Sequence, residues 1–288
     1  MSINGVLAGF VDGLLIGFVY GVAAMGLTLI FGVMDVINLA HGPLIAIGMF
    51  GVYELFTYLG MNPYLAIILV AIGGLFVGVI VYFAAVHRVI DAPPLSSLLS
   101  TFSVNMMIIG VGTAILSTSA YNVNFSLPTL SVGPITVTGS RIAAALIAIL
   151  VTALLYGFLY RTRPGKYIRA VANNRQAAEL MGIPSTRILA LAFGVGTMLA
   201  MTAGALIATI LPINILAGGT YELKSFVIVV LGGLGNPLGA LVGGLVLGLI
   251  EGLVPIFLKV TWVPVIEFGL FVLILLVMPQ GLFGKKGS

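Results

Sequence analysis

Uncharged stretches long enough for a membrane helix recur along the whole chain, and they restrict the fold more than any other feature. A helix needs about 20 residues to cross the hydrocarbon core, and in lipid only helices and closed barrels satisfy every backbone polar group. The pattern predicts an all-α polytopic membrane protein with about eight hydrophobic helical segments, some of them broken or re-entrant. The uncharged stretches are residues 13–34, 55–86, 92–140, 142–160, 188–221, 225–250 and 268–284.

The composition excludes several function classes. Only 7% of the 288 residues are charged, whereas about 25% of the residues in soluble domains are charged. The absence of cysteine excludes disulfides, thiolate metal sites and cysteine nucleophiles. The chain has no GxxxxGK[ST] phosphate-binding loop and no pattern typical of a catalytic triad, so we expect neither ATP hydrolysis nor another enzymatic activity. The net charge of +4 comes without a basic, aromatic-rich face, so nucleic acid is not an expected partner.

Residues 161–187 form the most charged segment of the chain. They hold six of the twelve Lys and Arg residues, together with Glu179. Each uncompensated charge at the bilayer centre costs about 3 kcal/mol or more, so this segment must lie in water. Because basic loops mark the cytoplasmic side, we interpret residues 161–187 as a cytoplasmic loop.

A short helix is predicted inside this loop. Asn173 is a suitable N-cap, residues 174–181 can form about two turns, and Gly182 is suited to the position after the last turn. Ala177, Ala178 and Met181 would give the helix an apolar contact surface. The segment is therefore either a helix that docks into another protein or only a basic loop that covers its neighbours.

The chain orientation follows from the basic residues. Residues 118–140 are polar without a single charge, which is typical of an extracytoplasmic loop, and residues 131–139 predict a small β-hairpin. If the basic clusters face the cytoplasm, the N-terminus lies outside, the C-terminus lies inside, and residues 212–222 lie outside. The stretch 224–259 is broken at residues 231–240, and it forms either two short crossings or one re-entrant element.

Two interruptions rich in glycine, asparagine and proline occur in the two halves of the chain, at residues 37–43 and 231–239. Paired interruptions are typical of half-helices that meet at a transport site, where helix ends offer partial charges to a polar solute. In a chain with 38 glycines such breaks also arise by chance. The candidate pathway residues are Asn38, His41, Gly42, Gly233, Gly235 and Asn236.

Glycines at four-residue spacing predict close packing between helices. One string comprises Gly235, Gly239 and Gly243. A second string comprises Gly244, Gly248 and Gly252. Such spacing lets helix backbones approach each other closely in lipid.

Several acidic residues and His41 lie within or beside the apolar stretches. Glu251 lies in a glycine-rich apolar helix, so it is either a functional residue of the pathway or a helix-end residue that reaches water near Pro255. A lone histidine is more often a hydrogen-bonded structural residue than a ligand, and we expect no metal site at His41. The carboxylates near predicted helix ends, which we expect at the membrane interface, are Asp12, Glu54, Glu222 and Glu267.

Four motifs resemble one family of transporters. They are GVMDVINLAHGPLIAIGMFGVY, PGKYIRAVANNRQAAELMGI, VVLGGLGNPLGALVGGLVLGLIEGL and LLVMPQGLFG. Together they are similar to the inner-membrane permease subunit of branched-chain amino acid ABC importers of the high-affinity leucine/isoleucine/valine type. Permeases for urea and short-chain amides share these motifs.

The resemblance implies a single transmembrane permease domain over residues 1–288, located in the inner (plasma) membrane. It also implies a homologous second permease subunit, two cytoplasmic ABC ATPases and a periplasmic amino-acid-binding protein as partners. ATP and Mg would be bound by the ATPases, and this chain would hold no cofactor. Many members of the family carry an acidic residue where this chain has Pro43, which weakens the case for a carboxylate that handles the substrate amine there.

The resemblance further implies that residues 169–182 are the coupling helix seated on an ATPase, and that residues 38–42 lie near the translocation path. The coupling residues would be Arg169, Asn173, Asn174, Ala177, Ala178, Glu179, Met181 and Gly182. An alternative from a different class is a stand-alone secondary transporter, in which an embedded carboxylate such as Glu251 or Glu54 would bind a proton or sodium.

Overall fold

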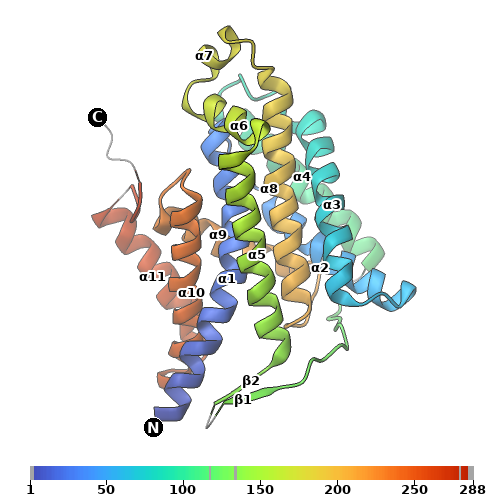
Figure 1. Cartoon of the computed structure of the whole chain (residues 1–288), viewed down its shortest axis with the longest axis vertical. Coiled ribbons are helices and arrows are strands. Elements are labelled where there is room, and N and C mark those ends of the chain that lie inside the picture. Colours follow the sequence, from blue (N-terminus) through green and yellow to red (C-terminus); the bar gives the residue numbers. More distant parts are fainter. Residues whose placement is uncertain (1–2, 117, 133–134, 279, 285–288) are drawn as a thin grey trace.

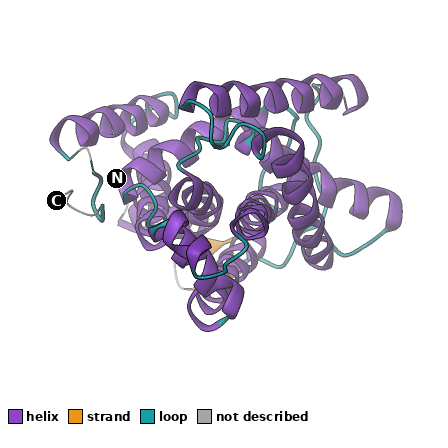
Figure 2. Ribbon diagram, turned by 90° about the horizontal axis from the view of Figure 1, so that it is seen from above, coloured by secondary structure: helices purple, strands orange, loops and turns teal. Residues whose placement is uncertain are grey.

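The chain is a bundle of helices with one small hairpin. The computed structural model describes residues 3–116, 118–132, 135–278 and 280–284. Figure 1 shows the bundle from the side, and Figure 2 shows it from above, with several central helices viewed close to end-on. The elements are α1 (Ile3–Met34), α2 (His41–Leu59), α3 (Pro63–Val81), a π-helical turn (Tyr82–Val86), α4 (Pro94–Leu116), β1 (Leu130–Val132), β2 (Ile135–Val137), α5 (Gly139–Arg161), α6 (Arg163–Asn173), α7 (Arg175–Leu180), α8 (Ser185–Ala208), α9 (Ala217–Gly232), α10 (Pro237–Phe257) and α11 (Trp262–Val277).

The predicted all-α membrane fold is confirmed. Within the described residues, seven helices are long and apolar enough to cross a membrane, and α11 is a shorter apolar helix. The predicted hairpin is also present, since β1 and β2 pair in antiparallel register from Leu130 opposite Val137 to Val132 opposite Ile135. Its predicted turn, Gly133 and Pro134, lies outside the described residues.

The centre of the bundle is built on α1 and α8, whose side chains are mostly buried. Helix α10 packs along α1 through facing glycines. A Cβ atom at Gly13 would lie 2.6 Å from the carbonyl oxygen of Gly248, and one at Gly17 would lie 2.9 Å from that of Gly244. The second glycine string therefore has the close-packing role that its spacing predicts.

The first glycine string is not one helical row. Gly235 precedes α10 and has a φ of +78°, so it belongs to the turn that leads into this helix. Gly239 and Gly243 lie in α10 and pack against α9, where a Cβ atom at Gly243 would lie 2.7 Å from the carbonyl oxygen of Ile228. The expectation of a single string was wrong because the helix begins only at Pro237.

The first interruption is a re-entrant turn. Helix α1 ends at Met34, yet α2 begins at His41, whose side chain contacts the carbonyl oxygen of Ala23. Ala23 precedes the end of α1 by about three turns, roughly 16 Å of helix. The chain therefore runs back into the bundle before α2 starts.

Helix α9 begins at the same depth. Gly218 in its first turn lies against Gly42 in the first turn of α2. The expectation that residues 212–222 all lie outside the membrane was wrong for the second half of this range, since Gly218 and Glu222 lie inside the bundle. The start of the range stays beside the polar loop, because Ile213 pairs with Tyr121. The stretch 224–259 therefore consists of most of α9, a turn at residues 233–236, and α10.

The basic segment contains two helices where one was expected. Thr162 caps α6, with its hydroxyl accepting from the amide of Gly165 at 3.2 Å, and Pro164 lies in the first turn. Helix α6 continues through Asn173, so the predicted N-cap at Asn173 was wrong. Asn174 caps α7 instead, and its Oδ1 accepts from the amide of Ala177 at 2.9 Å. Both helices lie at the upper end of the molecule in Figure 1, opposite β1 and β2.

Candidate functional site

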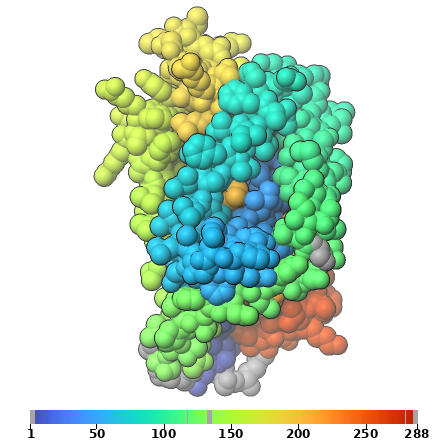
Figure 3. All heavy atoms as spheres, turned by 90° about the vertical axis from the view of Figure 1, so that its right-hand side faces the viewer, coloured from blue at the N-terminus to red at the C-terminus, as the bar shows by residue number. Residues whose placement is uncertain are grey.

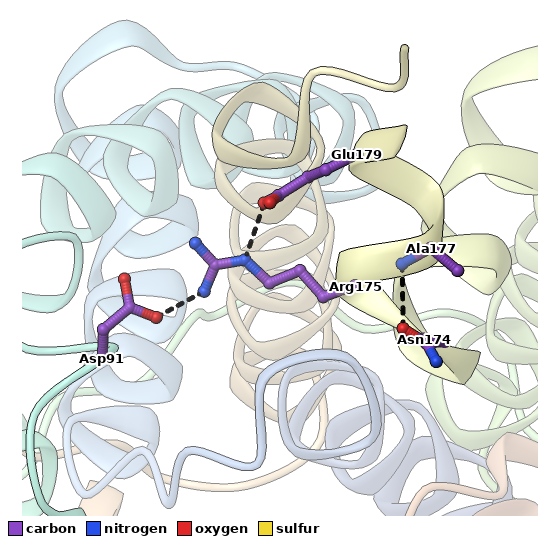
Figure 4. Close-up of polar contacts among 5 residues, drawn as sticks. All are labelled: Asp91, Asn174, Arg175, Ala177 and Glu179. Atoms are coloured by element: carbon purple, nitrogen blue, oxygen red, sulfur yellow. Dashed lines mark hydrogen bonds and ion pairs between the residues drawn. The ribbon is translucent and has the colours of Figure 1, made fainter. Parts of the chain in front are cut away.

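Helix α7 and its flanks form a protruding tip of the molecule. The side chain of Arg175 is ion-paired to Asp91 at 2.7 Å and to Glu179 at 3.1 Å (Figure 4). Burial lowers the pKa of Arg175, but the hydrogen bonds to Asp91 and Glu179 outweigh burial and raise the pKa above its usual value. Arg175 therefore stays charged and joins α7 to the loop before α4.

The apolar residues of this tip face outward. Leu180 is 89% exposed and Met181 is 83% exposed. Ala177 is also exposed, whereas Ala178 is buried against its own chain with 5% exposure. The expectation that Ala178 offers a contact surface was therefore wrong, and the sequence reasoning missed Leu180. Gly182 has a φ of +81°, which suits the glycine predicted at the end of this helix.

Arg169 lies at the base of the tip and not at its surface. Its Nε donates to the carbonyl oxygen of Leu159 at 3.0 Å, and its guanidinium lies 4.4 Å from the centre of the Tyr160 ring. Together with Asn173 it lines a cavity of about 740 Å³ at the end of α1.

The second interruption lines the same cavity through Gly235 and Asn236. Asn236 caps α10, because its Oδ1 accepts from the amides of Leu238 and Gly239 at 3.1 and 3.3 Å. Gly233 has a φ of +97°, a conformation that other residues rarely adopt. The predicted pathway residues of this interruption thus lie beside Arg169 and Asn173 of the basic segment.

Asn38 and His41 lie inside the bundle, and both are fully buried. The Oδ1 of Asn38 accepts from the amide of Ala40 at 3.1 Å. The Nε2 of His41 lies 3.0 Å from the carbonyl oxygen of Ala23, so this nitrogen carries the proton. No described residue hydrogen-bonds to the Nδ1 of His41.

A polar cluster holds this re-entrant turn. Thr101 of α4 accepts from the amide of Leu39 at 3.2 Å and donates to the carbonyl oxygen of Ile37 at 3.1 Å. Asn105, one turn further along α4, donates to Leu39 and to the Glu222 carboxylate, the latter at 3.3 Å. Helices α2, α4 and α9 therefore meet at this turn through polar groups.

Glu222 was expected at the membrane interface, and this was wrong. It is only 7% exposed, and its carboxylate lies against the first turn of α2 at Gly42. A carboxylate is stabilised at a helix N-terminus by the unpaired amides and the helix dipole. No local sequence signal predicts this position, because the groups that face Glu222 come from α2 and α4, far away in the sequence.

Glu251 belongs to a separate ionic cluster. Its carboxylate lies 2.7 Å from the Nζ of Lys224, which also lies 3.4 Å from Glu267. The Lys224 ammonium lies 4.9 Å from the centre of the Tyr20 ring. Glu251 is thus ion-paired inside the bundle, and Glu267, with 2% exposure, is not the interfacial residue that was expected.

The two interruptions therefore do not form one site. Asn38, His41 and Gly42 pack with α4 and α9 in the interior, while Gly235 and Asn236 line the cavity near the basic segment. Seven apolar spans with a protruding basic end define a multi-pass membrane protein.

The chain belongs to the family described as branched-chain amino acid transport system / permease component, whose model matches residues 9–278. It is 31% identical to the high-affinity branched-chain amino acid transport system permease protein LivH of Escherichia coli strain K12, covering 95% of this chain and 94% of that protein. It is equally 31% identical to BraD of Pseudomonas aeruginosa, covering 96% and 94%. A probable LivH of Methanocaldococcus jannaschii is 27% identical over 76% of this chain and 71% of that protein. No solved structure matches the chain.

Proposed function

We propose that this chain is one of two permease subunits in an ATP-driven importer that moves branched-chain amino acids into the cytoplasm. The observation that carries the proposal is the similarity to permeases named for this transport over 95% of the chain. The second subunit would be a homologous permease. A periplasmic binding protein would deliver the amino acid, and two cytoplasmic ATPases would bind ATP and Mg. The chain itself would hold no cofactor and catalyse no reaction.

The coupling role would belong to residues 161–187. The exposed apolar pair Leu180 and Met181 supports a docking surface for an ATPase, because such a pair on a protruding tip is otherwise unfavourable in water. Arg175 would hold α7 rigidly enough to transmit a push into the bundle, through its ion pair with Asp91. The cavity lined by Arg169, Asn173 and Asn236 would lie on the route of that movement.

The solute path would pass the interior turn at residues 38–42. A zwitterionic amino acid needs polar partners for its charged groups, and the first turns of α2 and α9 meet there beside Asn105 and Glu222. The cytoplasmic exit would then be near Gly235 and Asn236.

Uptake by the assembled complex tests the function. The two permeases and two ATPases are reconstituted in vesicles with the binding protein outside and ATP-Mg inside. We expect ATP-dependent uptake of leucine, isoleucine and valine that excess urea does not inhibit. Inhibition by urea would favour an amide permease. Uptake by this chain alone, driven by an ion gradient without ATP, would favour the secondary transporter.

A further inference from the structure

An apolar groove lies between α2 and α4, with Ile215 at its side. It encloses about 650 Å³, and its walls are almost entirely aliphatic and aromatic. This volume falls in the range of roughly 300 to 1,000 Å³ that is typical of small-molecule sites. Figure 3 looks onto the side of the molecule on which α2, α3 and α4 lie, and the surface is hollowed between the blue and the green atoms. The side chains that line the groove include Ile47, Phe50, Glu54, Ile108 and Ile215.

Glu54 is the single charged residue among those that line this groove. Among the described residues, no hydrogen-bond or ion-pair partner of its carboxylate is found. Glu54 lies in the last third of α2, roughly 20 Å of helix beyond His41, so its half-buried carboxylate lies at the outer end of the groove. The groove therefore carries a negative charge at this end that no cation of the described residues compensates.

The inner end of the groove is polar. Helices α2 and α4 both point away from the basic end and toward the end of the molecule that carries the hairpin. Gly42 on α2 and Asn105 on α4 each precede the groove residues of the same helix. At that point Asn105 donates to Glu222, while the buried Oδ1 of Asn105 has no partner in the part of the chain that the structure describes. The groove thus has an apolar wall, one free carboxylate toward its outer end, and an amide and a second carboxylate beyond its inner end.

We propose that this groove is the subsite for the transported solute, in which the apolar wall takes an aliphatic side chain and Glu54 binds the α-ammonium group. The inference rests on the proposed function, because it places the solute of that same importer in this groove. An aliphatic amino acid combines an apolar branch with one ammonium group, which complements an apolar groove with one unpaired carboxylate. A helix of the second permease would fill the apolar wall but would leave Glu54 unpaired unless it brought a cation of its own.

Binding of amino acids to the permease complex itself tests the subsite. The binding protein is left out because it has a selectivity of its own. The complex of two permeases and two ATPases is placed in nanodiscs without binding protein, and radiolabelled leucine and phenylalanine are titrated. We expect Glu54→Gln to weaken leucine binding roughly tenfold or more, because a charge-assisted hydrogen bond is lost. We expect Ile47→Ala or Ile108→Ala to raise phenylalanine binding relative to leucine by roughly tenfold, because the pocket gains room.

A narrowing variant gives the opposite change. A Cβ atom at Gly112 would lie 2.7 Å from the Cδ1 of Ile215, so Gly112→Val reduces the pocket and should lower leucine binding more than alanine binding. Ile72→Ala on α3 is the matched control, since Ile72 is 50% exposed and does not line the groove. It should leave both ligands unchanged.

Three results would overturn the subsite. One is unchanged binding in all groove variants, and another is the absence of leucine binding in a wild-type complex that transports leucine. The third is parallel loss of the second permease from the purified complex, which would identify the groove as an interface between permeases. If the wild-type complex shows no ATP-dependent leucine uptake at all, the proposed function fails first, and the two failures are thereby distinguished.

Discussion

At the scale of single residues, close contacts between backbones decide which positions must be glycine. Gly42 and Gly218 lie in the first turns of α2 and α9, and each occupies the space that a Cβ atom of the other would need. The carboxylate of Glu222 lies against the same turn. The interior turn of the proposed path is therefore assembled from two helix starts that touch directly.

Gly42→Ala tests this contact. The added Cβ atom would come within 2.5 Å of the carbonyl oxygen of Gly218, so the two turns must separate. We expect a loss of about 1 to 3 kcal/mol in stability, as for other overpacked sites, together with reduced uptake. Thermal unfolding of the purified complex gives the first quantity. Gly73→Ala on α3 is the control because no atom lies within 4 Å of its added Cβ atom, and equal losses in both variants would contradict the contact.

Lys224→Met tests the ionic cluster. The substitution leaves Glu251 and the buried Glu267 close together without a cation. Because Lys224 and Glu251 are both partly exposed, the loss should be smaller than the roughly 3 kcal/mol or more of a fully buried pair. We expect a lower midpoint of thermal unfolding in detergent. The double variant Lys224→Met with Glu251→Gln removes one carboxylate and should recover much of the loss. Lack of recovery would mean that Lys224 acts through packing and not through its charge.

At the scale of elements, most of the apolar helices largely coincide with an uncharged stretch of the sequence, but α2 and α10 contain Glu54 and Glu251 and cross the boundary of a stretch. The depth at which a helix begins does not follow from these stretches. The seven candidate spans were identifiable from length and charge alone. The depths at which α2 and α9 begin were harder to predict, because both helices start inside the bundle beside α4. No local pattern distinguishes a helix that starts at mid-depth from one that starts at the surface, since that difference lies in which other backbone it meets.

The contact between α1 and α10 depends on glycines that let the two helix backbones approach closely. Gly248→Leu should separate these two helices, because an added Cβ atom meets the backbone of both Gly13 and Gly17. We expect a loss of about 3 kcal/mol or poor insertion, measured as the yield of monodisperse protein and the unfolding midpoint. Gly269→Leu on α11 is the matched control, since no atom lies within 4 Å of its Cβ position. A normal yield of the Gly248 variant would refute the glycine packing.

At the scale of the whole molecule, the basic end and the interior turn are connected by α1 and α8. Helix α1 runs from the end of the hairpin to the cavity lined by Arg169, passing the depth at which His41 contacts Ala23. A movement of α6 and α7 would therefore reach the proposed path through elements that are themselves buried and closely packed. This geometry suits a machine whose energy source lies outside the chain.

Leu180→Glu tests this coupling. The side chain is 89% exposed, so the stability of the isolated chain should change by less than about 0.5 kcal/mol. Placing a charge at the centre of an apolar docking contact should lower ATP-driven uptake roughly tenfold or more. Two quantities are measured: ATP-driven uptake of the solute, and the amount of ATPase that co-purifies with the tagged permease. Gln176→Glu on α7 is the matched control, because it adds the same charge at an exposed polar position. Normal uptake by the Leu180 variant would refute the docking surface.

The sequence by itself determined the membrane class, the approximate spans, the hairpin and the water-facing basic segment, because each depends on hydrophobicity and charge within one stretch. The tertiary structure alone decided where Glu222, Lys224 and Leu180 lie. It also separated the two interruptions, bringing one together with α4 and α9 and the other together with α6. The physical reason is that a charge inside the bundle is stabilised by its partners, and these partners lie far away in the sequence, as Glu222 and Asn105 show.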